Sequence, residues 1–222
     1  WLLSFVFGML PYVLWGREFT LINAWFESVS GYTTTGATIL TDIEALPKSI
    51  LFWRSSTHFI GGLGVIVFLL MILPDSSAVK LRLTNLELSS LSKEGYRFRS
   101  GTTARVMVGV YCALTTCLFL LLWAAGMSPF DALNHAFSTV STGGFSTRNM
   151  SIMHYDSVII DLILTVFMIL SSMHVGTLFA IAVKRSFKPL GNSVTRYYLS
   201  IIAVISIIII SAMLTTANSP SI

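Results

Sequence analysis

Charged residues are scarce in this chain. Asp, Glu, Lys and Arg make up 11% of its 222 residues, whereas a soluble domain carries about 25%. Hydrophobic residues account for 54%, and the mean hydropathy is +0.78. So few charges would not keep this much apolar surface in water, which predicts that most of the chain lies in lipid. The net charge of +4, without aromatic residues interleaved on a polar face, gives no sign of nucleic-acid binding.

Cysteines and catalytic motifs are also few or missing. Cys112 and Cys117 lie five positions apart in an apolar run, so a helix would point them to different faces. We therefore expect packing residues and neither a disulfide nor a metal site. The sequence has no GxSxG, no phosphate-binding Walker loop and no HExxH. These absences predict a protein that is not an enzyme and that has no covalent cofactor.

What the sequence does contain is a series of apolar runs. The last four of five long runs are long enough to cross hydrocarbon, which takes about 20 residues. Two shorter pieces, 21–30 and 129–139, are semi-apolar and would reach about 15 Å as helices, half a bilayer. The pattern predicts an all-α integral membrane protein. The five long runs are residues 1–15, 50–73, 104–126, 157–183 and 197–214.

Each short piece leads into a stretch rich in hydroxyl side chains and glycine. The two copies read "INAWFESVSGYTTTGA" and "FDALNHAFSTVSTGGF". The Thr-Gly pair at 35–36 matches the Thr-Gly pair at 142–143 at an offset of 107, whereas Ala24 matches Ala132 at an offset of 108. By this pairing, the first copy has one extra residue. Internal repeats of this kind are frequent in membrane transport proteins.

The repeat divides the chain into units. Residues 1–74 are expected to form a first helix–pore-loop–helix unit with a truncated N-terminus, and residues 104–184 a second. A basic loop, 75–103, would join them. Residues 185–222 would then supply a loop and the first helix of a third unit.

The orientation follows from the distribution of Lys and Arg. Ten of the 14 basic residues lie in two segments, six in 80–105 and four in 184–196. The positive-inside rule places loops 75–103 and 184–196 in the cytoplasm, so both Thr-Gly stretches enter the cell (inner) membrane from outside. The alternative, that the basic loops only bind acidic lipid, leaves this multi-pass topology unchanged.

Polar, glycine-containing backbone at membrane depth has a specific use. Unpaired peptide groups are costly in lipid unless they line a cavity or pack against protein. We call a helix that reaches only halfway through the bilayer a half-helix. After a half-helix, such a backbone can turn its carbonyl oxygens toward the axis of a pore, where they replace the hydration shell of a monovalent cation. Glycine permits the backbone angles that this requires, and the partly negative end of the half-helix faces the cation.

These stretches resemble the Trk/Ktr/HKT superfamily of potassium transporters, and most closely its Trk-type bacterial potassium uptake branch. The residues that carry the resemblance are "FESVSGYTTTGAT" at 26–38, "WRSSTHFIGGLGVIVFLLMILP" at 53–74 and "HAFSTVSTGGFST" at 135–147. It covers essentially the whole chain. It implies four helix–pore-loop–helix repeats around one potassium path, of which this chain would hold about two and the first helix of a third.

The resemblance also implies partners and a mode of action. The remaining repeats of the same chain would complete the pore, and the protein would be a homodimer in the lipid bilayer. A cytosolic regulatory subunit would carry the nucleotide and dock on the inner face. Potassium would be the transported ligand, either down its gradient or coupled to another ion. A sodium-permeable or mixed cation transporter is the nearer alternative, and a membrane scaffold or intramembrane enzyme the distant one.

The selectivity-filter residues are carried over from the same resemblance. The key glycines would be Gly36 and Gly143, with Thr35 and Thr142 beside them as potassium contacts. A glycine in the first filter goes with potassium and a serine with sodium, so Gly36 favours potassium. The implied filter positions are Thr34, Thr35, Gly36, Ala37 and Thr38 in the first loop and Ser141, Thr142, Gly143, Gly144 and Phe145 in the second.

Four acidic residues are candidates for the outer mouth. Glu27 would either raise the local cation concentration or bond the filter backbone. Asp42 and Glu44 would attract cations or simply lie in a solvated loop. Asp161 lies within an apolar run, where an acid is a functional candidate, although it would also reach interfacial water.

The remaining polar residues have plainer interpretations. Asp131 follows Ser-Pro and is expected to cap the second half-helix. Arg148 would face the vestibule or pair with an acid. His58 and His174 are expected to be packing residues. The glycines at 61, 62 and 64 would let helices approach closely, with a gating hinge as the alternative.

Overall fold

The computed structural model describes residues 1–17, 19–72, 100–173, 177–178, 181 and 188–217. These residues form helices and loops, without a strand among them. The chain divides into two units, one made of Trp1–Pro74 with Arg99–Ser172 and the other of Asp75–Phe98 with Met173–Ile222. The predicted basic loop 75–103 lies almost wholly outside the described residues, as do His174 and residues 184–187.

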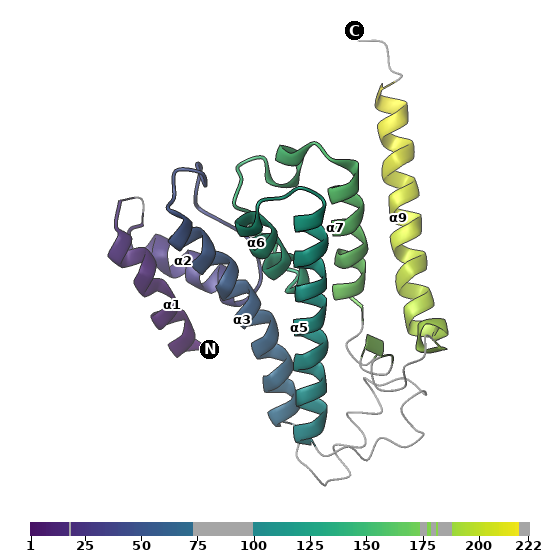
Figure 1. The fold of residues 1–222 in the computed structure, drawn as a ribbon, viewed down its shortest axis with the longest axis horizontal. Coiled ribbons are helices and arrows are strands. Elements are labelled where there is room, and N and C mark those ends of the chain that lie inside the picture. The colour runs from purple at the N-terminus through teal and green to yellow at the C-terminus, as the bar shows by residue number, and fades with distance from the viewer. Residues whose placement is uncertain (18, 73–99, 174–176, 179–180, 182–187, 218–222) are drawn as a thin grey trace. The chain divides into compact units, whose positions relative to one another are not determined.

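The first unit begins with a helix, a half-helix and a long helix (Figure 1). These are α1 (Leu2–Trp15), α2 (Leu21–Tyr32) and α3 (Lys48–Ile72). The Thr20 side chain accepts a hydrogen bond from the Asn23 N–H at 3.3 Å, which satisfies one of the free donors at the start of α2. The predicted order of long helix, short helix, polar loop and long helix is confirmed, whereas the crossing of a membrane by α1 and α3 stays a prediction.

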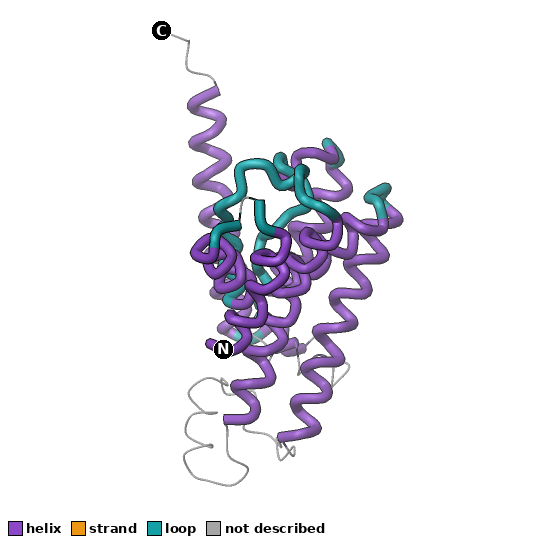
Figure 2. The backbone as a smooth tube through the Cα atoms, turned by 90° about the vertical axis from the view of Figure 1, so that its left-hand side faces the viewer, coloured by secondary structure: helices purple, strands orange, loops and turns teal. Residues whose placement is uncertain are grey.

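The same order returns in the second half of this unit. It contains α5 (Ser100–Ala124), α6 (Pro129–Val140), a short 3-10 helix η2 (Ser151–Tyr155) and α7 (Val158–Ser171). Ser128 caps α6 and Pro129 occupies its first turn, where the missing N–H costs nothing. In Figure 1, α3 and α5 lie side by side and extend beyond the half-helices toward one end, and Figure 2 shows connecting loops gathered at the other.

The fourth apolar run is not one continuous helix. It was expected to be helical over 157–183, yet α7 ends at Ser171, and the Ser172 N–H bonds back to the last turn; residues 177, 178 and 181 are helical again. Two adjacent serines interrupt the apolar pattern there. Serine competes for backbone hydrogen bonds and is therefore favoured at helix ends over helix interiors.

Two hydrophobic clusters hold the first unit together, one for each copy of the repeat. In the first cluster, Tyr12 of α1 and Ala24 of α2 are fully buried. In the second, Leu118 and Leu122 of α5 pack with Ala132 of α6 and Leu164 of α7. The small alanine side chains, at equivalent places in the two half-helices, let each half-helix lie close to its long neighbours.

Large apolar side chains remain on the outside of both units. Leu2, Leu14 and Ile22 in the first unit are 73%, 85% and 78% exposed. In the second unit, which contains η3 (Lys188–Gly191) and α9 (Ser193–Ala217), most isoleucines of α9 are exposed as well. By length and apolarity, Arg105–Ala124 and Ser193–Met213 could cross a membrane, and α1 and α7 are shorter apolar helices.

Candidate functional site: the two glycine-containing loops

The loops that follow α2 and α6 share positive φ values and a backbone hydrogen bond at equivalent positions. Thr34 and Gly36 have positive φ values of 54° and 77°, and Thr142 and Gly144 have values of 56° and 98°. The Thr35 N–H bonds to the Ser30 carbonyl at 3.0 Å. In the second loop the Gly143 N–H bonds to the Ser138 carbonyl at 2.8 Å. Each of these pairs is related by an offset of 108.

This offset corrects the sequence-based pairing of the two copies. Half-helices of 12 residues each begin and end 108 positions apart, so the first copy has no extra residue. Gly36 is therefore equivalent to Gly144, and Thr35 to Gly143. The prediction that Gly143 is the counterpart of Gly36 is wrong by one residue, because it relied on the shared Thr-Gly letters and not on backbone angles.

The two adjacent glycines of the second loop have different physical reasons to be glycine. Gly144 has open space around it but adopts a positive φ, which an L side chain rarely does. At Gly143, a Cβ would overlap the imidazole ring of His58. Gly143 therefore provides room for His58, and Gly144 provides the turn.

Equivalent serines tie each loop to its half-helix. The Ser30 hydroxyl donates to the carbonyl oxygen of Ala37 at 2.6 Å. Ser138, at the equivalent position, accepts from the Gly144 N–H at 2.9 Å. These bonds satisfy loop backbone groups and hold each loop close to the C-terminal end of a half-helix, where the helix dipole is negative.

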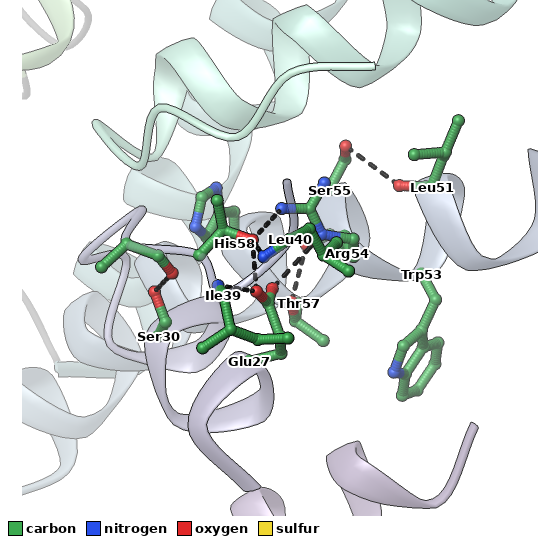
Figure 3. A network of polar contacts seen from close by, with 12 residues as sticks. Glu27, Ser30, Ile39, Leu40, Leu51, Trp53, Arg54, Ser55, Thr57 and His58 are labelled. Atoms are coloured by element: carbon green, nitrogen blue, oxygen red, sulfur yellow. Dashed lines mark hydrogen bonds and ion pairs between the residues drawn. The ribbon is translucent and has the colours of Figure 1, made fainter. Parts of the chain in front are cut away.

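Behind the loops lies a buried ion pair. Glu27 of α2 and Arg54 of α3 are 0% and 1% exposed, and Arg54 Nε lies 3.3 Å from Glu27 Oε2. The other carboxylate oxygen, Oε1, accepts from the Thr38 hydroxyl and, at 2.9 Å, from the Ile39 N–H. Figure 3 shows the two charged side chains pointing toward one another from their helices. Of the two alternatives for Glu27, the structure shows the bond to the loop backbone, at the Ile39 N–H. The outer-mouth role stays a prediction, for a side chain that is buried and paired with Arg54.

Arg54 also reaches the second loop. Its NH2 donates to Thr38 Oγ1 at 3.2 Å, and its NH1 donates to the Ser146 carbonyl oxygen at 3.4 Å. The guanidinium carbon lies 4.1 Å from the centroid of the Phe145 ring. We call Glu27, Thr38, Arg54, Phe145 and Ser146 the Arg54 cluster.

Phe145 is held by a second residue of α3. The His58 ring stacks on it with centroids 4.0 Å apart and planes 17° apart. His58 Nδ1 lies 3.3 Å from the Ser138 hydroxyl, while its Nε2 has no hydrogen-bond partner. The prediction that His58 is a packing residue is confirmed, with one nitrogen left unpartnered. Helix α3 thus contacts the second loop through both Arg54 and His58.

The second copy has no carboxylate at the corresponding place. Glu27 is equivalent to His135 at the offset of 108, and Thr38 is equivalent to Ser146. The His135 Nε2 and Ser146 Oγ atoms are 3.5 Å apart. The hydrogen-bonded contact between half-helix and loop is thus repeated, but the acid and its arginine belong to the first copy alone.

Hydrogen bonds of polar side chains connect the chain segment after the first loop, at residues 42–44, with the segment after the second loop, at residues 148–149. Asn149 Nδ2 donates to Asp42 Oδ1 at 2.8 Å, and Asn149 Oδ1 accepts from the Ile43 N–H at 2.6 Å. The Asn149 amide holds the pKa of Asp42 below its usual value, because it stabilises the carboxylate. Asp42 is exposed, and both its position at the mouth and its effect on cations stay predictions.

Arg148 forms ion pairs with acidic side chains, which was one of the two alternatives predicted for it; the other was a position facing the vestibule. It lies 3.2 Å from Asp131 and 3.5 Å from Glu44. Asp131 is not the cap of α6: Ser128 is, because its hydroxyl accepts from the Asp131 N–H at 3.1 Å. Asp161 is exposed in the first turn of α7, where a carboxylate suits the helix N-terminus, and its pore role stays a prediction.

The glycines of α3 serve close packing in at least two places. A Cβ on Gly61 would overlap the carbonyl oxygen of Tyr32, and one on Gly62 would overlap the Tyr111 hydroxyl. A Cβ on Gly64 would only reach ordinary contact distance from Trp1. The packing prediction is confirmed for Gly61 and Gly62, and the gating hinge stays a prediction.

Sequence reasoning missed Arg54 and Asn149. An arginine inside a predicted membrane span was a usable signal, because such a residue almost always pairs or contacts backbone carbonyls. Asn149 gave no comparable signal, because its partners lie about a hundred positions away in the chain.

The chain is similar to known proteins over nearly its whole length. It matches the TrkH family, described as "Cation transport protein", over residues 2–219. It is 39% identical over 183 residues to the Trk system potassium uptake protein TrkH of Salmonella typhimurium and to that of Escherichia coli K12. Each alignment covers 82% of this chain and 38% of the relative.

Two further relatives extend this coverage. The Trk system potassium uptake protein TrkG of Escherichia coli K12 is 35% identical over 215 residues, covering 95% of this chain and 44% of the relative. The crystal structure of the potassium transporter TrkH from Vibrio parahaemolyticus is similar with a TM-score of 0.74 and 30% identity. That match covers 91% of this chain and 41% of the solved one, so the chain spans less than half the length of these relatives.

Proposed function

From the TrkH family of cation transport proteins, to which this chain belongs, we propose that it forms part of a pore that takes up potassium ions across a cell membrane. The family is one of transporters, and the chain is not an enzyme. The relatives it resembles are Trk system potassium uptake proteins and a potassium transporter.

One observation carries the proposal: two half-helices end in loops that have positive φ angles at equivalent positions, and these two loops contact each other. A Cβ on Gly36 would overlap the carbonyl oxygen of Gly143, so the loop backbones are in contact. Repeated non-helical backbone at the end of half-helices is what a carbonyl-lined filter needs.

In the proposed filter, the ion-facing oxygens come from within residues 34–38 and 141–145, while the Ala37 carbonyl oxygen and the Thr38 hydroxyl are bonded to Ser30 and Glu27. The offset of 108 makes Gly36 and Gly144 the equivalent glycines, and Gly143 becomes the neighbour that accommodates His58. Thr35 and Thr142 remain proposed potassium contacts. Gly36 favours potassium over sodium in this proposal, because a serine at that position is the sodium-associated alternative.

The complete pore needs more than this chain. We assign two of four repeats to the first unit and the first helix of a third repeat to α9. The remaining repeats, a second copy in a homodimer and a cytosolic nucleotide-binding subunit would complete the transporter. The filter loops face outside, and the basic loops 75–103 and 184–196 face the cytoplasm, as the positive-inside rule requires.

Cation uptake by the full-length protein tests the function. It would be expressed with its regulatory subunit in a bacterial strain that lacks its own potassium uptake, and growth at low potassium and the potassium-to-sodium flux ratio would be measured. We expect Gly36→Ser and Gly144→Ser each to lower that ratio by roughly tenfold, equivalent to about 1.4 kcal/mol of discrimination.

Gly109→Ser is the matched control, because Gly109 lies in α5 with open space around it and should leave the ratio unchanged. If the protein supports growth but neither loop variant alters the ratio, the loops are not the filter. If the unmodified protein conducts sodium as readily as potassium, the sodium alternative replaces the potassium one.

A further inference from the structure

We propose that Arg54 is a positioning residue, and that the buried Glu27–Arg54 pair sets the spacing between the two filter loops and thereby the preference for potassium over sodium. The inference rests on the proposed function. It assigns the cation preference in part to residues behind the loops, which do not touch the ion.

The geometry places one side chain against both loops. Nε of Arg54 bonds Glu27, and NH2 bonds Thr38 at the end of the first loop. NH1 bonds the Ser146 carbonyl, directly after the second loop. The guanidinium is a rigid plane, so these three contacts hold two side chains of the first copy, Glu27 and Thr38, at a fixed distance from the Ser146 backbone of the second.

Glu27 completes the link from the opposite side. Its Oε1 accepts from the Thr38 hydroxyl and the Ile39 N–H, so the first loop is bonded to both members of the pair. A lysine at position 54 would keep the charge but present a single nitrogen, without the three-way fork. The arrangement therefore requires arginine in particular, and not merely a positive charge.

The energetics explain why such a pair would be retained. Removing two charges from water is costly, and well-packed apolar residues often serve stability equally well. A buried pair that is this fully hydrogen-bonded is better explained by the geometry it fixes. Filter spacing is one property that depends on geometry, because ion preference depends on how the surrounding carbonyls are arranged.

Among the described residues, only the first copy of the repeat has a buried Glu–Arg pair, and this difference between the copies supports a positioning role for Arg54. The residue equivalent to Glu27 is His135, which contacts Ser146 in its own copy but brings no carboxylate. The first copy thus supplies the ion pair, and its arginine extends to the second loop. Neutralisation by Glu27 also prevents Arg54 from presenting an unbalanced positive charge close to the cation path.

The test measures potassium and sodium uptake by the full-length protein with its regulatory subunit in proteoliposomes. Arg54→Lys keeps the charge and loses the fork, whereas the double variant Glu27→Gln with Arg54→Met removes both charges and leaves neither unpaired. Arg196→Gln is the control, because Arg196 is exposed at the start of α9. The amount of monodisperse purified protein reports folding separately.

We expect Arg54→Lys and the double variant to lower the potassium-to-sodium ratio by about fivefold or more, as lost hydrogen bonds to a charged group would imply. We expect Arg196→Gln to keep it. An unchanged ratio in either active Arg54 variant would overturn the inference and show a purely structural role. If Arg54→Lys does not fold, the double variant decides, because a neutral pair avoids the uncompensated buried charge. Failure of the unmodified protein to take up potassium would instead overturn the proposed function.

Discussion

The carbonyl oxygen of Gly143 lies where a Cβ atom on Gly36 would stand. The first loop therefore approaches the second through backbone alone, at a residue whose φ of 77° already favours glycine. Two independent requirements, the backbone angle and the missing side chain, meet at Gly36. Both disfavour a side chain at this position in the present arrangement of the loops.

Gly36→Ala is expected to destabilise the protein by about 2–5 kcal/mol, from left-handed backbone strain together with the overlap. The thermal midpoint of the purified full-length protein in detergent would measure this. Gly109 lies within α5 and has open space around it, so Gly109→Ala should instead leave the stability of the folded protein unchanged or raise it by about 0.5–1 kcal/mol. Equal midpoints for the two variants would contradict the close approach of the loops.

Gly143→Ala is expected to be destabilising and to be rescued by a second change. The added methyl group would collide with the His58 ring, so Gly143→Ala combined with His58→Ala should recover part of the lost stability. Gly144→Ala should not be rescued by His58→Ala, because its cost arises from a φ of 98° and not from a contact. The four variants would be compared by thermal unfolding. Rescue of Gly144→Ala would mean that the two glycine roles are assigned the wrong way round.

Phe145→Leu is expected to cost about 1–3 kcal/mol beyond the loss of buried area, because the ring is contacted by both a guanidinium and an imidazole. Phe119→Leu is the comparison, since Phe119 stacks on Trp123 without a cation. Thermal unfolding of both variants gives the difference. A smaller loss at position 145 than at 119 would show that the Arg54 contact contributes little.

The contact between Asp42 and Asn149 is expected to weaken in acid. The pKa of Asp42 in the folded protein is lowered, chiefly by the Asn149 amide. Its contribution to stability is therefore fully present above the unfolded value of about 3.9 and is lost as the pH falls through the lower folded value. Thermal midpoints between pH 6 and pH 3, compared with those of Asn149→Ala, would measure it. A decline that is the same in Asn149→Ala would exclude Asp42 as the group responsible.

The layout of the fold could be predicted from the sequence, because its signals are local. The half-helices were expected at 21–30 and 129–139 and are found at Leu21–Tyr32 and Pro129–Val140. Length and apolarity are properties of a continuous stretch. The end of α7 was missed because a pair of serines is a weak interruption in a strongly apolar run.

The details of the site could be predicted only in part. The loops were identified, but the shared Thr-Gly letters gave a register one residue from the one that the φ values define. The ion pair was missed because its partners, 27 positions apart, meet only through folding. For Glu27 the sequence left two alternatives open, since no local pattern distinguishes an acid at the mouth from one that bonds the loop backbone.

The position of Arg54 in the chain has a consequence for biosynthesis. During translation, α2 and α3 emerge well before the second loop, so Glu27 and Arg54 can pair while the NH1 donor has no Ser146 carbonyl, which lies 92 positions later. In this order of synthesis the first copy can present Arg54 before its acceptor in the second copy exists.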